Sequence, residues 1–328
     1  MITRLALPLT LLLLGSPILG AQAIQADPSL PAYKPGAQVS GTIALVGHDT
    51  MEGMIRGWIG AFAKFHPAAR IDYSVRDTVP EDRSALGPDT AEVFNNTDEP
   101  YIDKYGCEPF RIQVSMATCD SKGHIQAIGV FVNSENPISS ITLAQLDAIY
   151  STTRRRGYPA DITTWGHLGL SGEWADKPIH FYGRTVKNEV PWRFRDVVLL
   201  DGAFKAAYRE APPKKLSVDV ANSVAGDRYG IGFVGLAYGT DRIRALALAE
   251  RDGGPIAQPN AGDVALGRYP LDRPFFIYVN RRPGQPLDPL VKEFLSFVLS
   301  REGQELVPKD GNFPIPPRIA AAERGKLD

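Results

Sequence analysis

A short polar loop formed by His48, Asp49 and Thr50 has residue types that suit the binding of a small anion. If a helix begins here, its first turn leaves backbone N–H groups without partners and carries about half a positive charge, which a bound oxyanion satisfies. Thr50 can cap that turn or donate its hydroxyl to a ligand. The alternative is that Asp49 or Thr50 only caps a structural helix, and the loop alone does not decide between the two.

The segments on either side of the loop predict the elements that would position it. Thr42 to Val46 are β-branched or apolar and end at Gly47, a pattern typical of a strand in a sheet covered on both faces. The apolar residues after the loop recur with the period of a helix and predict one buried face, which ends before Pro67. This face consists of Met51, Met54, Ile55, Trp58, Ile59, Phe62 and Phe65.

Two later strands are also followed by polar residues. Thr90 to Phe94 precedes a polar run from Asn95 to Asp98, and the short strand Ile179 to Tyr182 precedes the loop of Arg184. Ligands collect beyond the carboxyl ends of strands in an open α/β sheet. We therefore expect these two loops and the first one to line a single cleft.

The rest of the chain alternates between strand and helix patterns, which predicts an α/β fold. Two strands at 112–119 and 126–133 are expected to form a ribbon around a turn at 121–123. A short helix is expected to open at 223–227. Further strands are expected at 70–75, 230–234 and 274–279, and further helices at 143–150, 191–199 and 288–301.

Residues 1–23 have the pattern of a secretory signal peptide. Arg4 is followed by an apolar run from Leu5 to Leu14 and by a small-residue cleavage site at Ala21-Gln22-Ala23. Residues 24–37 are rich in proline and are expected to form an extended lead-in on the surface. No other stretch approaches about 18 consecutive apolar residues, so we expect a soluble, exported mature chain.

Charge and cysteine usage narrow the classes of partner. The chain has 36 Lys and Arg against 37 Asp and Glu, which argues against strong attraction to nucleic acid or to a membrane surface. Cys107 and Cys119 are expected to form one disulfide in an exported chain, worth roughly 3 kcal/mol. No metal site is expected, because the cysteines and the scattered histidines lack metal-ligand spacing.

Enzyme motifs are missing from the sequence. It contains no G-x-S-x-G, no H-E-x-x-H and no phosphate loop that ends in Gly-Lys-Ser or Gly-Lys-Thr. His48 beside Asp49 could form half of an acid-base pair, although neighbours on one loop rarely face each other. A phosphoester hydrolase therefore stays a minor alternative, and no cofactor is expected.

Several segments, in order along nearly the whole mature chain, resemble the PstS-like phosphate-binding proteins of bacterial ABC importers, a branch of the two-lobed periplasmic binding proteins. They are GHDTMEGMIRGW at 47–58, FVNSENPISSITLAQLDAIYS at 131–151, TWGHLGLSGEW at 164–174, FYGR at 181–184, YGIGFVG at 229–235, YPLDRPFFIYVN at 269–280 and FLSFVLSREGQELV at 294–307.

The resemblance implies two α/β lobes joined by two crossing strands, with the anion bound between them. Lobe 1 would comprise residues 38–130 and 274–328, and lobe 2 residues 131–273. It further implies a monomeric, non-enzymatic binding protein that captures inorganic phosphate or a similar oxyanion and delivers it to an ABC permease at the inner membrane.

The resemblance also implies which residues bind the anion. Thr50 and Met51 would offer a hydroxyl and backbone N–H groups, with His48 and Asp49 beside them. Thr78 would supply a second hydroxyl.

Arg184 matches the arginine of the family, and a guanidinium can hold an oxyanion by two parallel bonds. The alternative is that Arg184 forms a salt bridge with Glu189 or Asp196. Thr97 and Asn188 complete the set of expected ligand residues.

The chain departs from the pattern of the family at two points. Asn188-Glu189-Val190 stands where the family usually has Ser-Gly-Thr, and a glutamate that pointed inward there would repel an anion. Thr97 stands where some members carry an aspartate that accepts the proton of monohydrogen phosphate. These departures support an alternative function, a degenerate member that acts as a periplasmic interaction or sensory protein with a weak or different ligand.

Overall fold

The structure, a computed structural model, describes residues 24–47, 49–75, 91–95, 108–122, 124–186, 188–214, 216–281, 284 and 286–327. The expected signal peptide at residues 1–23 lies outside these ranges. No helix within them is long and apolar enough to cross a membrane.

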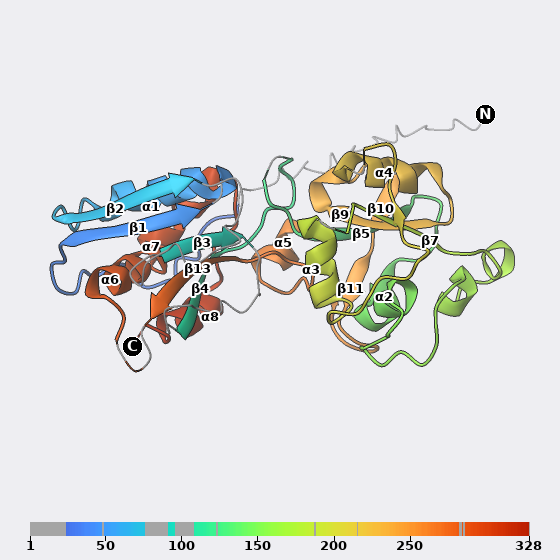
Figure 1. Cartoon of the computed structure of the whole chain (residues 1–328). Helices are drawn as coiled ribbons and strands as arrows, with labels where there is room; N and C mark the ends of the chain where they lie inside the picture. The colour runs from blue at the N-terminus through green and yellow to red at the C-terminus, as the bar shows by residue number, and fades with distance from the viewer. Residues whose placement is uncertain are drawn as a thin grey trace, which may run out of the picture.

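Lobe 1 is built around a sheet with the strand order β2-β1-β3-β13-β4 (Figure 1). β1 runs parallel to β2 and β3, whereas β13 runs antiparallel to β3 and β4. The strands are β1 (Gly41–Gly47), β2 (Ala69–Val75), β3 (Ala91–Asn95), β4 (Glu108–Ser115) and β13 (Phe275–Arg281). Its helices are η1 (Asp49–Met51), α1 (Glu52–Phe62), α6 (Pro289–Val298), α7 (Arg301–Gln304), η6 (Val307–Asp310) and α8 (Pro317–Arg324).

Lobe 2 contains a second sheet, β10-β5-β9-β7-β8, and a small sheet, β12-β11-β6. The strands are β5 (Ile128–Asn133), β6 (Ser140–Thr142), β7 (His180–Gly183), β8 (Arg209–Glu210), β9 (Gly230–Gly235), β10 (Ile243–Ala245), β11 (Ala247–Ala249) and β12 (Ile256–Ala257). Its helices are α2 (Leu143–Tyr150), η3 (Trp165–Leu168), η4 (Gly172–Trp174), α3 (Glu189–Val197), α4 (Ser217–Gly226), η5 (Leu236–Tyr238) and α5 (Ala261–Ala265). The two-lobed α/β fold that the sequence predicts is therefore confirmed.

Two segments cross between the lobes, residues 116–127 after β4 and residues 266–274 before β13. They run together, because Ile128 N donates to Leu271 O at 2.9 Å and the Tyr269 hydroxyl donates to Ile128 O at 3.1 Å. The expected ribbon of 112–119 and 126–133 is wrong for β4 and β5, which pair in different sheets, although Thr118 forms a bridge with Gln126 beside the expected turn. The apolar pattern identified both strands but carried no information about their partners.

α1 packs on lobe 1 through the face that the sequence predicts. Trp58 Nε1 donates to Gly303 O at 2.8 Å and so ties α1 to α7. The expected face extends too far, because α1 ends at Phe62 and Phe65, 37% exposed, lies in the turn that follows. The buried residues of the helix are Met54, Ile55, Trp58 and Phe62.

The lead-in at residues 24–37 does not lie wholly on the surface. Leu30 and Tyr33 are buried, and the Tyr33 hydroxyl donates to Glu293 Oε1 on α6 at 2.5 Å. The same hydroxyl lies 2.7 Å from His66 Nε2. This segment is therefore a packed part of lobe 1.

α3 and α4 cover the sheet of lobe 2. Phe194 of α3 stacks on Phe233 of β9 with ring centroids 3.9 Å apart. α4 begins at Ser217, so the expected helix start at 223–227 is wrong. Its N-cap, Leu216, gives no sequence signal for a helix start, and the Asp219 carboxylate accepts from the Leu216 N–H at 2.9 Å instead.

Candidate functional site

The lobe 1 half of the expected site is the start of α1. Asp49 opens η1 directly after β1, and Met51 is the N-cap residue of α1 without a side-chain cap. Met51 is completely buried. Thr50 is half-buried beside it. His48 lies outside the described residues, as do Thr78 and Thr97, and their ligand roles stay predictions.

A carboxylate that is not among the expected site residues lies at the same helix start. Asp310 of η6 accepts a hydrogen bond from the Met54 N–H, and burial raises the pKa of this carboxyl while His124 opposes the rise. A Cβ on Gly53 would lie 2.1 Å from Asp310 Oδ1, so the glycine permits this close approach. One helix-start donor is therefore already used within the chain.

The lobe 2 half of the site is the loop after β7, which carries Arg184. Arg184 Nη1 donates to Ser217 Oγ at 3.4 Å at the start of α4, and the Tyr208 hydroxyl donates to Arg184 O at 2.7 Å. Arg184 Nε is buried and has no hydrogen-bond partner among the residues that the structure describes. The guanidinium thus keeps one buried donor for another acceptor.

The expected alternative partners of Arg184 are engaged elsewhere. Glu189 Oε2 lies 3.6 Å from Arg273 Nη2, and Asp196 Oδ2 lies 3.1 Å from Arg193 Nη1. The structure therefore does not place Arg184 in a salt bridge with either carboxylate.

Asn188 acts as the N-cap of α3. Its side-chain oxygen accepts from the Val190 N–H at 3.1 Å. This capping hydrogen bond explains the position of the Asn188 side-chain amide in the structure. A contact between Asn188 and a ligand stays a prediction.

The start of α1 and the helix α3 lie on the facing sides of the two lobes (Figure 1). In Figure 1 the arrows of β2 and β3 point toward lobe 2, and β1 runs parallel to both, so its carboxyl end and the start of α1 also face that lobe. α3 lies on the side of lobe 2 nearest lobe 1 (Figure 1). η1 therefore begins on the side of lobe 1 that faces lobe 2, and the Arg184 loop connects β7 to α3.

The expected disulfide is not seen. Cys119 is a free, half-buried cysteine in the first crossing segment, and Cys107 lies outside the described residues. Burial raises the pKa of the Cys119 thiol to about 12, which keeps it protonated and unreactive at neutral pH. The pairing stays a prediction.

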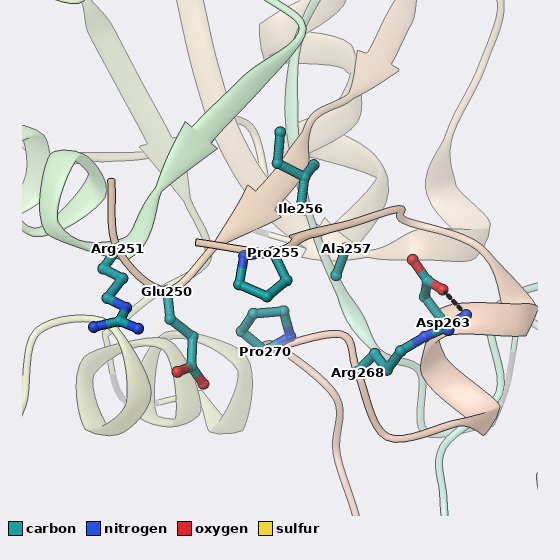
Figure 2. Close-up of a pocket in the computed structure, with 8 residues that line it drawn as sticks. All are labelled: Glu250, Arg251, Pro255, Ile256, Ala257, Asp263, Arg268 and Pro270. Atoms are coloured by element: carbon teal, nitrogen blue, oxygen red, sulfur yellow. Dashed lines mark hydrogen bonds and ion pairs between the residues drawn. The ribbon is translucent and has the colours of Figure 1, made fainter. Parts of the chain in front are cut away.

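Two surface cavities, of about 650 and 680 Å³, lie on lobe 2 away from the expected site residues. Figure 2 shows the first, with Pro255 and Pro270 at its centre and the Arg268–Asp263 pair on one side. Within the described ranges no cluster of His, Cys, Asp and Glu side chains could hold a metal ion.

Comparisons with known proteins show which family the chain belongs to. A model of the PBP superfamily domain matches residues 124–302. The phosphate-binding protein PstS of Pseudomonas aeruginosa is 35% identical over 307 residues, which cover 92% of this chain and 91% of that protein.

Two solved structures share the fold. PstS from Borrelia burgdorferi matches with a TM-score of 0.57 and 16% identity, over 84% of this chain and 100% of its own. An ABC-type phosphate transport receptor from Vibrio cholerae matches with a TM-score of 0.54 and 17% identity over the same shares, 84% and 100%.

Proposed function

Because this chain belongs to the PBP superfamily and, within it, to the PstS-like phosphate-binding proteins, we propose that it binds inorganic phosphate between its lobes and delivers it to an ABC permease at the inner membrane. In this proposal the protein works in the periplasm as a monomer and catalyses no reaction. Contacts to the anion from both lobes drive a hinge closure about the two crossing segments.

The observation that carries the proposal is the buried Nε of Arg184, which has no partner in the described part of the chain. A buried donor without an acceptor costs about 1–3 kcal/mol, so this position favours a ligand that supplies one. Phosphate oxygens can accept from a guanidinium through two parallel bonds. The position of Arg184 directly after β7 supports its role as the clamp on the lobe 2 side.

Lobe 1 would contribute the start of α1. The Met51 backbone N–H and the Thr50 hydroxyl are the donors, and the positive end of α1 favours an anion there. Asp310 takes the Met54 N–H, which lies further along the first turn of α1 than these two groups.

A second function, a periplasmic interaction or sensory role, is favoured by a different observation. Asn188 and Asp310 already satisfy donors at the starts of α3 and α1. A site whose hydrogen-bond donors are already bonded to side chains of the same protein would bind phosphate weakly or not at all. This alternative predicts no measurable phosphate affinity.

The test of the clamp is the variant Arg184→Ala. Loss of hydrogen bonds to a charged group should weaken phosphate binding by about 1.5–3 kcal/mol, roughly 10- to 150-fold. Calorimetric titration of the ligand-stripped protein measures the affinity. The matched control is Arg228→Ala on the same lobe. The guanidinium of Arg228 pairs with Glu173 and Glu135 at 2.8 Å, and the variant that lacks it should bind phosphate as wild type does. Wild-type affinity in Arg184→Ala would contradict the assignment.

A further inference from the structure

The second crossing segment contacts α3 through charged side chains. Arg273 Nη2 lies 3.6 Å from Glu189 Oε2, in the first turn of α3. Arg193 Nη2, further along α3, donates to Asp272 O at 3.5 Å. α3 follows the Arg184 loop, so these contacts join the lobe 2 half of the site to the hinge.

Arg273 is buried, and its charge requires an anion nearby. Its side chain is only 4% exposed, whereas that of Glu189 is 49% exposed. Burial and the positive charge of Arg193 lower the pKa of Arg273. The negative charge of Glu189 raises this pKa more than any other neighbouring group does. A buried ion is retained when a partner of opposite charge compensates for its desolvation.

The same pair matters for Glu189. This glutamate begins the helix that follows the Arg184 loop, on the side of lobe 2 that faces lobe 1 (Figure 1). A carboxylate without a partner there would repel a phosphate, because both are negative. Its contact with Arg273 neutralises that charge and directs the carboxylate toward the crossing segment.

We propose that Arg273 is a positioning residue of the anion site, which acts through Glu189. By pairing with Glu189, it removes the repulsion between this carboxylate and the bound anion and allows a site with an acidic residue at the start of α3 to accept phosphate. The inference rests on the proposed function, since it concerns phosphate affinity.

The first test compares two variants of Glu189, whose side chain is half-exposed. Glu189→Gln removes the charge and should bind phosphate at least as tightly as wild type. Glu189→Asp keeps the charge but shortens the side chain by about 1.5 Å. Because the distance from the Glu189 carboxylate to the Arg273 guanidinium is already near the limit of an ion pair, the shorter side chain cannot reach Arg273. Its phosphate affinity, measured by calorimetric titration, should fall about tenfold.

The second test is a rescue. Arg273→Met should weaken phosphate binding about tenfold, and Arg273→Met with Glu189→Gln should return to within about threefold of wild type. Arg273→Lys keeps the positive charge and should also stay within about threefold. The control is Glu173→Asp, which shortens a carboxylate paired with Arg228 on the same lobe and should leave phosphate affinity unchanged.

The outcomes separate this inference from the proposed function. If wild type binds phosphate but Glu189→Asp and Glu189→Gln have equal affinity, the inference is overturned and the proposed function stands. A double variant as weak as Arg273→Met would show that Arg273 only packs α3. If Arg273→Met does not fold, the two Glu189 variants still decide. If wild type itself does not bind phosphate, the proposed function fails.

Discussion

Asp272 shows how a single residue at the hinge can make stability depend on pH. It is buried between the two crossing segments, where it accepts from the Ala117 and Arg273 N–H groups and lies near the charges of Arg193 and Arg273. Burial outweighs these favourable contacts and raises the pKa of Asp272 to about 7. The folded protein therefore binds this proton more tightly than the unfolded chain.

The sign of the effect follows from linkage. Because the pKa of Asp272 is higher in the folded state, its contribution to stability is present at about pH 4 and is lost as pH rises through about 7. The free energy of unfolding of wild type should therefore fall between pH 5 and pH 8. In Asp272→Asn, which cannot titrate at this position, that fall should be smaller by more than about 1 kcal/mol. Urea unfolding at the two pH values measures this, with the exposed Asp252→Asn as control. An unchanged pH dependence in Asp272→Asn would contradict the role.

Individual site residues were only partly predictable. The resemblance pointed to Arg184, and the structure gives it a buried donor without a partner among the described residues. The sequence could not show that Arg273 neutralises Glu189, because the two residues are distant in the chain and meet only through the return crossing. Asp310 at the start of α1 was missed for the same reason.

At the level of elements, local patterns predicted what each segment becomes but not what it pairs with. The apolar run of β1, the periodic face of α1 and the helix expected at 143–150 each depend on a single segment, and the structure contains all three. The pairing of β4 with β13 and of β5 with β9 depends on distant strands. Local sequence therefore could not exclude the ribbon that was expected between β4 and β5.

The close packing of α7 against the end of α6, and the open surface of α1 at Gly57, predict opposite effects of two glycine substitutions. A Cβ on Gly303 would lie 2.3 Å from Phe297 O and 2.6 Å from Val298 O, which are backbone atoms that cannot move away. Gly303→Ala should therefore destabilise the protein by about 1–3 kcal/mol. Gly57, inside α1, has nothing within 4 Å of such a Cβ, and Gly57→Ala should stabilise by about 0.5–1 kcal/mol.

Urea unfolding of the two variants under one set of conditions measures the difference. The account of the packing between α6 and α7 would be contradicted if Gly303→Ala were as stable as wild type. Because Gly303 O also accepts from Trp58 Nε1, a loss of stability should be accompanied by a change in tryptophan fluorescence of the folded state.

At the scale of the whole molecule, the fold follows from the connections between lobes. The sheet of lobe 1 is complete only when the chain returns from lobe 2 and β13 inserts between β3 and β4. This return places the second crossing segment against α3, beside the Arg184 loop. A motion of the lobes about the crossings would therefore act directly on the lobe 2 half of the site.

The central claim, that the chain closes on phosphate, is tested most directly by calorimetric titration of the mature, ligand-stripped protein. Phosphate is titrated at neutral pH and again near pH 5, with sulfate as the control anion. We predict saturable phosphate binding at one site per chain and no response to sulfate, and the two pH values show which protonation state of phosphate is bound. Silence toward both anions would contradict the claim and favour the interaction or sensory role.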